Sequence, residues 1–467
     1  MSETSSPYPS LPTDAGAPGT LRQVQRLVTL LQDLQEQLAV CNRCGLCQAV
    51  CPLFAATGRE ADVARGKLAL LNGLAQNLLQ NPRGVLDRLQ RCLLCGACAA
   101  NCPSGVRVTE TFLRARAILA GYLGLSPLQK AIFRGLLAQP RFFHRLLSLG
   151  AKCQGFFLKP ADELLGSSCA RFLSPLLSTR HVRSLAARPF HQQVPSFRAT
   201  AAPGRPTAAF FVGCLVDKFF PEVGQAVLTV LQQHGVGLVL PADQGCCGIP
   251  ALSAGDLTAF SRLVRHHLRH WQAQPWDYLI TACATCTATI KRLWPLFLAE
   301  ATTAEKAALD RLAAQTMDIS QFVVEVVGVA APAEATAAPA IKVTYHDPCH
   351  LKKSLGVAAQ PRALLQATPG LQLREMAAAD ECCGCGGSFT LQQYEISKAI
   401  GRHKIDHILA TGAAVVATGC PACMLQFLDL LSQRRARVRV RHTIELFAQA
   451  LTTPGCRDHR VLEGEFS

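Results

Sequence analysis

Two short stretches of the sequence have the same cysteine spacing. Residues 41–52 read CNRCGLCQAVCP, and residues 92–103 read CLLCGACAANCP. Each has three cysteines separated by two residues, then a fourth cysteine followed by proline. This spacing is typical of ferredoxin-type [4Fe–4S] sites, in which the fourth cysteine ligates the other cluster. It predicts two cubane clusters with crossed ligands, one on Cys41, Cys44, Cys47 and Cys102 and the other on Cys92, Cys95, Cys98 and Cys51.

Zinc ribbons are the main alternative, because pairs of cysteines with this spacing also suit tetrahedral zinc. Zinc needs only two such pairs, so it does not account for the third cysteine of each stretch or for the prolines. Periodic apolar residues predict helices over 21–39, 63–79, 84–91 and 108–120. The helical stretch between the two motifs resembles the all-α ferredoxin domain of respiratory iron–sulfur subunits. That resemblance implies such a domain over residues 21–125.

The composition indicates a multidomain globular protein. The chain has 467 residues, of which 49% are hydrophobic and 17% charged, and it contains 22 cysteines. Residues 1–20, rich in Ser, Pro, Thr and Gly, are predicted to be a disordered tail without the apolar core of a signal peptide. No apolar run is long enough to predict a membrane-spanning helix. Because secreted disulfide scaffolds are short, we expect a cytoplasmic protein with reduced cysteines.

The net charge of +15 is concentrated in one region. Residues 111–190 contain twelve Lys or Arg against two acids, Asp162 and Glu163. Residues 126–207 are predicted to be a basic helical connector that ends in a linker at 195–207. Its mixture of Leu, Phe and Arg fits an amphipathic stretch on a membrane surface or a packed helix with a solvated basic face. Few aromatic residues and no recognisable binding module argue against a nucleic-acid partner.

The rest of the chain contains one unit written twice, over residues 208–329 and 341–452, joined by a linker at 330–340. Cys214 and Cys349 are 135 positions apart, and the later cysteines of the unit recur after 136 and 137 positions. Such constant spacing indicates duplication. In each copy predicted strands alternate with helices, which favours an α/β fold with a parallel sheet. The cysteines follow the strands, where ligands of such sheets bind.

Each copy has the pattern of one cysteine, an adjacent pair, and a final pair separated by two residues. This pattern resembles the cysteine-rich CCG domain of heterodisulfide reductases, whose five cysteines hold a non-cubane four-iron cluster. The resemblance implies two further clusters, although buried structural thiols or zinc remain alternatives. The implied ligands are Cys214, Cys246, Cys247, Cys283 and Cys286 in the first copy, and Cys349, Cys382, Cys383, Cys420 and Cys423 in the second.

The order of these domains resembles the iron–sulfur subunits of the glycolate oxidase family, over nearly the whole chain. The matching stretches are RCLLCGAC at 91–98, NCPSGV at 101–106, YHDPCHL at 345–351 and ECCG at 381–384. Similar subunits serve D-lactate dehydrogenases, anaerobic glycerol-3-phosphate dehydrogenase and heterodisulfide reductase. The resemblance implies an electron-transfer subunit of a flavin-dependent 2-hydroxy-acid dehydrogenase, not catalytic alone.

Its partner would be an FAD-containing subunit oxidising glycolate or D-lactate, and its acceptor a quinone or another oxidant. No convincing dinucleotide fingerprint occurs in this chain, so the flavin would belong to the partner. The alternative is a catalytic subunit like that of heterodisulfide reductase, which reduces a disulfide at its non-cubane clusters. We expect a cytoplasmic location, with peripheral association at the inner face of the cytoplasmic membrane as a further expectation.

Other residues receive smaller roles. His346 and His350 flank Cys349 and could relay protons, or hydrogen-bond to a sulfur from outside the ligand set, which is the favoured interpretation. Cys385 is predicted to be a buried thiol without a ligand role. Residues 434–441 alternate Arg with Val and predict a strand with one solvated face. Three cysteines follow no ligand spacing and are predicted to be unligated: Cys153, Cys169 and Cys456.

Overall fold

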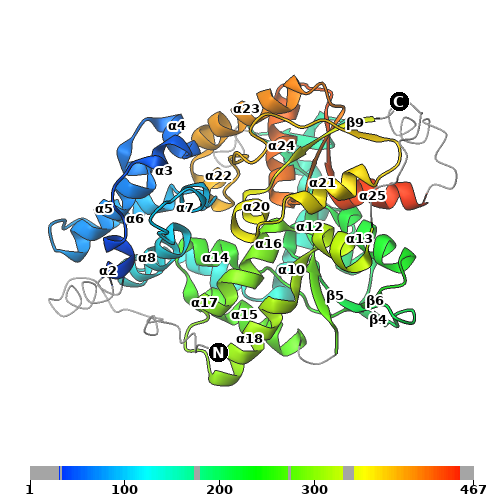
Figure 1. Cartoon of the computed structure of the whole chain (residues 1–467), viewed down its shortest axis with the longest axis horizontal. Helices are drawn as coiled ribbons and strands as arrows, with labels where there is room; N and C mark the ends of the chain where they lie inside the picture. The colour runs from blue at the N-terminus through cyan, green and yellow to red at the C-terminus, as the bar shows by residue number, and fades with distance from the viewer. Residues whose placement is uncertain (1–30, 32–33, 173–178, 272–274, 330–340, 453–467) are drawn as a thin grey trace.

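The structure is a computed structural model that describes residue 31 and residues 34–172, 179–271, 275–329 and 341–452 (Figure 1). The predicted tail at 1–20, most of the helix expected at 21–39, the linker at 330–340 and Cys456 lie outside these residues. Within the described part of the chain, no helix is long and apolar enough to cross a membrane.

The N-terminal region, up to residue 125, consists of short helices joined by turns, drawn in blue and cyan in Figure 1. Helix α5 ends earlier than predicted, because Asn77 takes a left-handed φ of 56° and the amides of Leu78 and Leu79 donate to the Gly73 carbonyl. Leu89 of α6 and Phe112 of α8 belong to the buried core. The elements are α2 (Gln35–Ala39), α3 (Leu46–Ala49), α4 (Pro52–Thr57), η1 (Glu60–Asp62), α5 (Ala64–Ala75), α6 (Pro82–Gln90), α7 (Ala97–Ala100) and α8 (Val108–Leu123).

The predicted helical connector is helical only in its first half. It contains α9 (Pro127–Lys130), η2 (Ala131–Leu137) and α10 (Pro140–Phe157). Then β1 (Leu158–Asp162), β2 (Ser167–Ala170) and β3 (His181–Arg183) form an antiparallel sheet. The prediction of an all-helical connector was therefore wrong. Gly166 takes a left-handed φ of 59° in the turn between β1 and β2, and the density of Leu and Phe concealed this hairpin.

The predicted linker at 195–207 also contains structure. Strand β4 (Phe197–Ala199), which follows α11 (Phe190–Gln193), pairs antiparallel with β6 (Gly237–Leu240). It forms the edge of a five-stranded sheet with the order β4-β6-β5-β7-β8. The remaining strands of this sheet are parallel: β5 (Thr207–Phe211), β7 (Tyr278–Thr281) and β8 (Thr316–Asp318).

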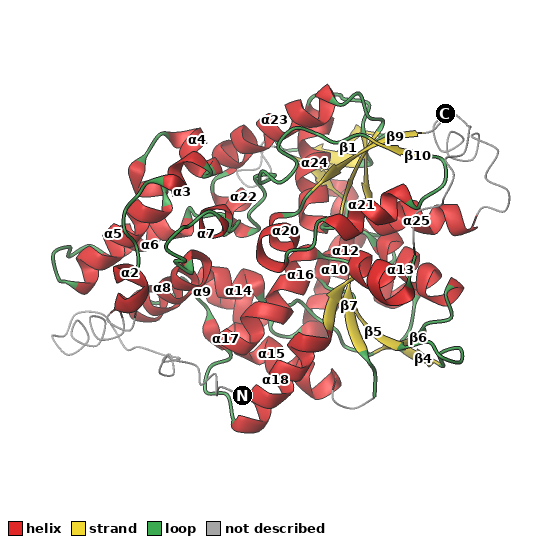
Figure 2. Ribbon diagram, in the orientation of Figure 1, coloured by secondary structure: helices red, strands yellow, loops and turns green. Residues whose placement is uncertain are grey.

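The second copy of the repeat forms a four-stranded parallel sheet with the order β10-β9-β11-β12. Apart from β4, this order is the same as that of the first sheet, as expected of a duplication. Helices cover both sheets (Figure 2). The strands are β9 (Ile341–His346), β10 (Leu371–Leu373), β11 (Val415–Thr418) and β12 (Arg439–His442).

Strand β12 differs from its prediction. Residues 434–438 form the turn after α24 (Pro421–Gln433), where Arg435 has a φ of 51°. Three of the four side chains of β12 are buried, so the strand has no fully solvated face. Pairing with β11 and the packing of α24 against β12 cover it.

The two repeats pack directly on each other. Helix α13 (Pro221–Gln233) of the first contacts α25 (Thr443–Thr452) of the second, and α16 (Ala284–Ala288) contacts α20 (Cys349–Leu355). The remaining helices of the first repeat are α12 (Cys214–Phe219), α14 (Ile249–Ala254), α15 (Leu257–Trp271), η3 (Thr289–Leu293), α17 (Trp294–Phe297), α18 (Thr303–Gln315), α19 (Ile319–Phe322) and η4 (Val323–Val327). Those of the second are α21 (Ala359–Gln366), α22 (Ser388–Gln392) and α23 (Tyr394–Ala410).

Candidate metal centres

The two ferredoxin-type stretches have the same backbone conformation. Arg43 and Gly45 have φ values of 59° and 88°, and Leu94 and Gly96 at the equivalent positions have 56° and 72°. These left-handed residues curl each loop between its first and third cysteines. Three thiols of one stretch therefore surround a common space.

The fourth cysteine of each stretch lies with the other stretch. One cavity of about 30 Å³ is lined by Cys51 together with three cysteines of the second stretch, Cys92, Cys95 and Cys98. A second cavity of similar size is lined by Cys102 together with three cysteines of the first stretch, Cys41, Cys44 and Cys47. Cys98 also reaches this second cavity. The grouping is the crossed one expected from the sequence.

The charges around these cavities fit anionic clusters. Burial, reinforced by Cys92 and Cys95, raises the pKa of Cys51 to about 11, so its thiolate needs a positive partner. Lys67 and Arg116 are 1% and 2% exposed, and both are close to the Cys92 thiol. Arg116 also donates to the Cys92 carbonyl, at 2.8 Å. Four thiols beside two buried cations suit a cluster whose thiolate ligands give it negative charge.

Sequence reasoning missed both cations. The signal was present in FLRARAILA at 112–120, where two arginines interrupt an apolar helix. Such arginines are buried only when something compensates their charge.

In the first repeat, the five cysteines follow the carboxyl ends of three adjacent strands. Cys214 begins α12 directly after Gly213, whose φ is 74°, and Cys246 and Cys247 lie between β6 and α14. Cys283 and Cys286 lie at the start of α16. Cys246 shares hydrogen bonds with Cys214 and Cys247, and Cys286 with Cys247 and Cys283.

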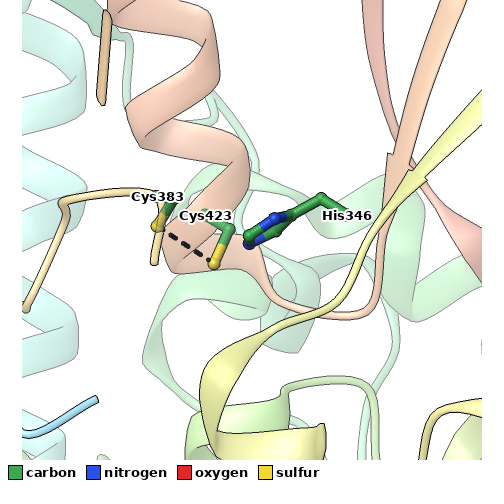
Figure 3. Close-up of side chains that lie close together, drawn as sticks. All are labelled: His346, Cys383 and Cys423. Atoms are coloured by element: carbon green, nitrogen blue, oxygen red, sulfur yellow. Dashed lines mark hydrogen bonds between the residues drawn. The ribbon is translucent and has the colours of Figure 1, made fainter. Parts of the chain in front are cut away.

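The second repeat places its cysteines in the same way. Cys349 begins α20, Cys420 precedes α24, and Cys423 lies in the first turn of that helix. Cys382 shares a hydrogen bond with Cys349, and the sulfur atoms of Cys383 and Cys423 are 3.3 Å apart (Figure 3). Five converging thiols in each repeat fit a polynuclear iron site, because they exceed the four ligands of a single zinc ion.

The thiols of different domains also meet. Cys95 of the ferredoxin-type region shares a hydrogen bond with Cys382, and Cys283 of the first repeat shares one with Cys420 of the second. The backbone holds the second contact in place, since the Ala284 amide donates to the Gly419 carbonyl at 3.0 Å. The result is a continuous series of neighbouring sulfurs, here called the thiol row: Cys95, Cys382, Cys349, Cys383, Cys423, Cys420, Cys283, Cys286, Cys247, Cys246 and Cys214.

The two predicted histidines differ in position. His350 joins three domains, because one ring nitrogen contacts the Leu94 carbonyl at 3.3 Å and the other the Thr285 hydroxyl at 3.0 Å. The same hydroxyl lies 3.5 Å from the Cys420 sulfur. His346 is fully buried with its ring against Cys383 and Cys423 (Figure 3), and burial lowers its pKa to about 3. It is therefore a neutral ring at neutral pH, and its predicted role beside the sulfurs stays a prediction.

The other cysteines lie apart from these cavities or beside them. Cys153 is exposed on α10, and Cys169 is partly buried in β2. Cys385 is buried near Cys383, and its sulfur accepts a hydrogen bond from the Gly387 amide. Its predicted absence from the ligand set stays a prediction.

Comparisons with known proteins agree with this arrangement. Residues 37–106 match the model of the 4Fe-4S dicluster domain, and residues 208–291 and 343–428 each match that of the cysteine-rich CCG domain. The chain is therefore an iron–sulfur protein of the class that joins a dicluster ferredoxin domain to two CCG domains.

Its relatives span the same architecture. Over 440 residues, or 92% of this chain and 97% of the relative, it is 29% identical to the probable glycolate oxidase iron-sulfur subunit of Bacillus subtilis. It is 35% identical over 243 residues, 52% of this chain, to a fumarate reductase (CoM/CoB) subunit of Methanothermobacter marburgensis, and these cover 46% of that protein. It is also 29% identical over 246 residues to lactate utilization protein A of an Exiguobacterium strain, covering 53% of this chain and 98% of the relative.

Proposed function

We propose that this chain is the electron-transfer subunit of a flavin-dependent 2-hydroxy-acid dehydrogenase, oxidising glycolate or D-lactate through a partner subunit. The observation that carries the proposal is the thiol row, which connects the ferredoxin-type region with both repeats. The proposed ligands are the eight cysteines of the two cubane sites and the ten of the two CCG sites. The names of the relatives, a probable glycolate oxidase subunit and a lactate utilization protein, support the substrate class.

The chemistry of the substrate requires a partner. A 2-hydroxy acid gives up two electrons together, as a hydride or its equivalent, and iron–sulfur clusters exchange electrons singly. An FAD-containing subunit would divide each pair, and a quinone or another acceptor would receive the electrons. Cys44 is exposed in the first cubane site, so this end of the molecule is accessible to the partner.

The test is coupled turnover. The isolated chain should not oxidise glycolate or D-lactate, whereas co-expression with its FAD subunit should restore electron flow from the hydroxy acid to a quinone analogue. Cys420→Ser or Cys349→Ser should stop that flow and leave flavin reduction by the substrate intact. Cys153→Ser, at an exposed cysteine outside the thiol row, is the matched control and should change neither. Oxidation of a hydroxy acid by the isolated chain would refute the proposal.

A second candidate function is catalysis on a disulfide, as in heterodisulfide reductases. It is favoured by the direct contact of Cys283 with Cys420, which brings the two repeats together at their cysteines. The similarity to the CoM/CoB fumarate reductase subunit is also stronger per residue than that to the glycolate oxidase subunit. Reduction of a disulfide by the chemically reduced, isolated chain would establish this candidate in place of the first.

A further inference from the structure

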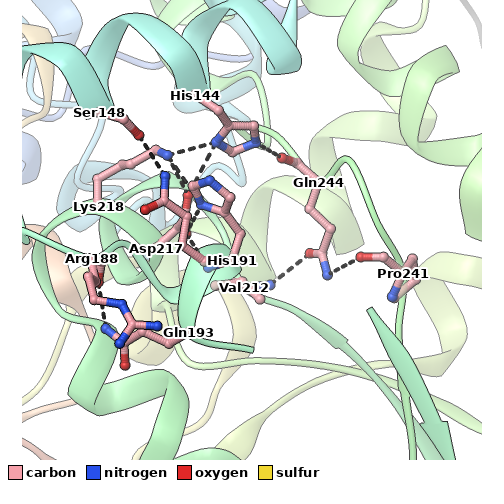
Figure 4. Close-up of polar contacts among 11 residues, drawn as sticks. His144, Ser148, Arg188, His191, Gln193, Val212, Asp217, Lys218, Pro241 and Gln244 are labelled. Atoms are coloured by element: carbon pink, nitrogen blue, oxygen red, sulfur yellow. Dashed lines mark hydrogen bonds and ion pairs between the residues drawn. The ribbon is translucent and has the colours of Figure 1, made fainter. Parts of the chain in front are cut away.

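The thiol row ends at a cavity that the functions above do not use. Cys214, the last cysteine of the row, lines a cavity of about 230 Å³ (Figure 4). The cavities at the cubane sites measure about 30 Å³ each. This cavity is therefore large enough for a small organic molecule, directly beside a candidate cluster ligand.

One wall of the cavity is polar and tightly connected. Lys218 is 2% exposed, and its Nζ lies 3.0 Å from the Asp217 carboxylate and 2.7 Å from Nδ1 of His144. Nδ1 of His191 lies 2.8 Å from the same carboxylate. Although burial opposes ionisation, the two histidines and Lys218 hold the pKa of Asp217 well below its usual range.

The polar atoms of His144, His191 and Asp217 converge as metal ligands would, within 4.8 Å of one another. The ammonium group of Lys218 lies among them and supplies the positive charge that a metal ion would bring. The cluster is therefore complete as a hydrogen-bonded network (Figure 4).

The network fixes how the two histidines are oriented. Nε2 of His144 lies 2.8 Å from the Gln244 carbonyl and donates to it, so Nδ1 accepts from Lys218. Nδ1 of His191 donates to Asp217. Among the described residues, no hydrogen-bond partner reaches Nε2 of His191, and this side chain is 35% exposed. His191 can therefore transfer a proton between solvent and a molecule in the cavity.

The remaining walls are apolar. The volume is below the roughly 300–1,000 Å³ of pockets for drug-sized ligands, so it suits a single ring better than a dinucleotide. An apolar cavity with a few hydrogen-bonding groups on one side fits a planar ring that carries carbonyl groups. The apolar lining consists of Phe143, Phe190, Val194, Val212, Leu240 and Pro241.

The geometry points to this cavity as the site where the electron acceptor, a quinone ring, is reduced; this inference rests on the function proposed above. A quinone takes up two electrons and two protons, and both carbonyl groups become hydroxyl groups. The electrons arrive singly from the Cys214 side. His191 donates each proton from Nε2 to a carbonyl oxygen and is reprotonated from solvent.

The test uses the full chain without a partner. The anaerobically purified chain is reduced with dithionite, and its reoxidation by decylubiquinone is followed by visible absorbance, with binding measured by equilibrium dialysis. Val194→Trp, which fills the cavity, should weaken binding and slow reoxidation at least tenfold with iron content unchanged. Gln193→Trp, on an exposed neighbouring position, should leave both within twofold. His191→Phe keeps the shape of the ring and should slow reoxidation tenfold while binding persists.

A photoreactive azidoquinone provides a measurement that needs no variant. It should label the peptides that contain Phe143 and Val194, and excess decylubiquinone should prevent the labelling. Labelling elsewhere, or reoxidation of Val194→Trp at the normal rate, overturns the inference. These readouts do not involve a hydroxy acid. If quinone binds here but the FAD subunit restores no hydroxy-acid oxidation, the proposed function fails and this site stands.

Discussion

At the scale of single residues, the crossed grouping of cysteines depends on a few left-handed positions. Arg43 and Leu94 have positive φ values, although side chains rarely adopt this conformation. Each loop can surround a cavity with only three of its thiols, because the fourth is carried away by α3 or α7. The opposite loop supplies the missing thiol in both cases.

This grouping predicts the effects of two serine substitutions. Cys102→Ser should damage the cluster held by Cys41, Cys44 and Cys47, since Cys102 lines their cavity. Cys51→Ser should damage the other cluster, for the same reason. EPR of the reduced protein distinguishes which cubane signal is lost in each variant. Loss of the cluster of the mutated motif in both variants would contradict the crossed ligand sets.

A buried carboxyl group at the contact between the repeats predicts a pH dependence. Burial raises the pKa of Glu445 to about 7, and its carboxyl group accepts a hydrogen bond from the His442 amide at 2.6 Å. Between about pH 4.5 and about pH 7, the folded chain keeps a proton that the unfolded chain releases. This residue therefore reduces stability as pH rises through that range, by at most about 1.4 kcal/mol per pH unit, and the reduction persists at higher pH.

Glu445→Gln should remove this effect and keep the hydrogen bond from the amide. Its melting temperature should match that of the wild type near pH 4.5 and exceed it increasingly up to pH 7.5. Glu395→Gln, at a residue whose side chain is 75% exposed, should show no such divergence. Parallel melting curves for Glu445→Gln and the wild type at every pH would show that Glu445 is ionised in the fold.

At the scale of elements, α10 has two different faces. Its inner face contributes Phe143 and His144 to the cavity beside Cys214. Its outer face exposes an apolar stripe at helical spacing, formed by Phe142, Leu146, Leu149 and Phe156. Part of the basic charge of this region is used internally, since Arg134 pairs with Asp256 and Arg183 with Glu222. The exposed basic residues are Lys130, Arg145, Lys152, Lys159, Arg171 and Arg188.

The stripe and these cations predict reversible binding to anionic membranes. Apolar side chains can enter the interface, and each nearby Lys or Arg contributes about 1 kcal/mol. Sedimentation with anionic liposomes should weaken steeply with added salt and be lost in the double variant Phe142→Ser/Leu149→Ser. Leu78→Ser, at an exposed residue distant from α10 in sequence, is the control and should bind normally. Equal binding to neutral and anionic liposomes, or none to either, would favour a helix that packs without a membrane.

At the scale of the whole molecule, much of the design could be predicted from cysteine spacing. The spacing identified the ferredoxin-type region and the duplication, and the family models match both. Predicted strands at 237–240 and 278–281 coincide with β6 and β7. Local sequence could not predict that β4 pairs with β6, because the partner lies about forty residues away. Strands β1–β3 are short and lie within a segment whose composition favours helix.

The relation between the sites was equally hidden. Spacing groups cysteines within a motif, but the contacts of Cys283 with Cys420 and of Cys95 with Cys382 depend on how the domains pack. The cluster of His144, His191, Asp217 and Lys218 draws on three helices and has no motif of its own. Tertiary packing therefore turns separate cysteine motifs into one row that ends at a polar cavity.

The most direct test of an iron–sulfur thiol row is the metal content of the anaerobically purified full chain. Iron and acid-labile sulfide should be present in near-equal amounts with little zinc. The two cubane sites alone should account for about eight irons, and iron bound by the repeats should raise the total above this. In Cys420→Ser, the excess over eight should fall while the cubane iron remains. Stoichiometric zinc without sulfide would contradict the account.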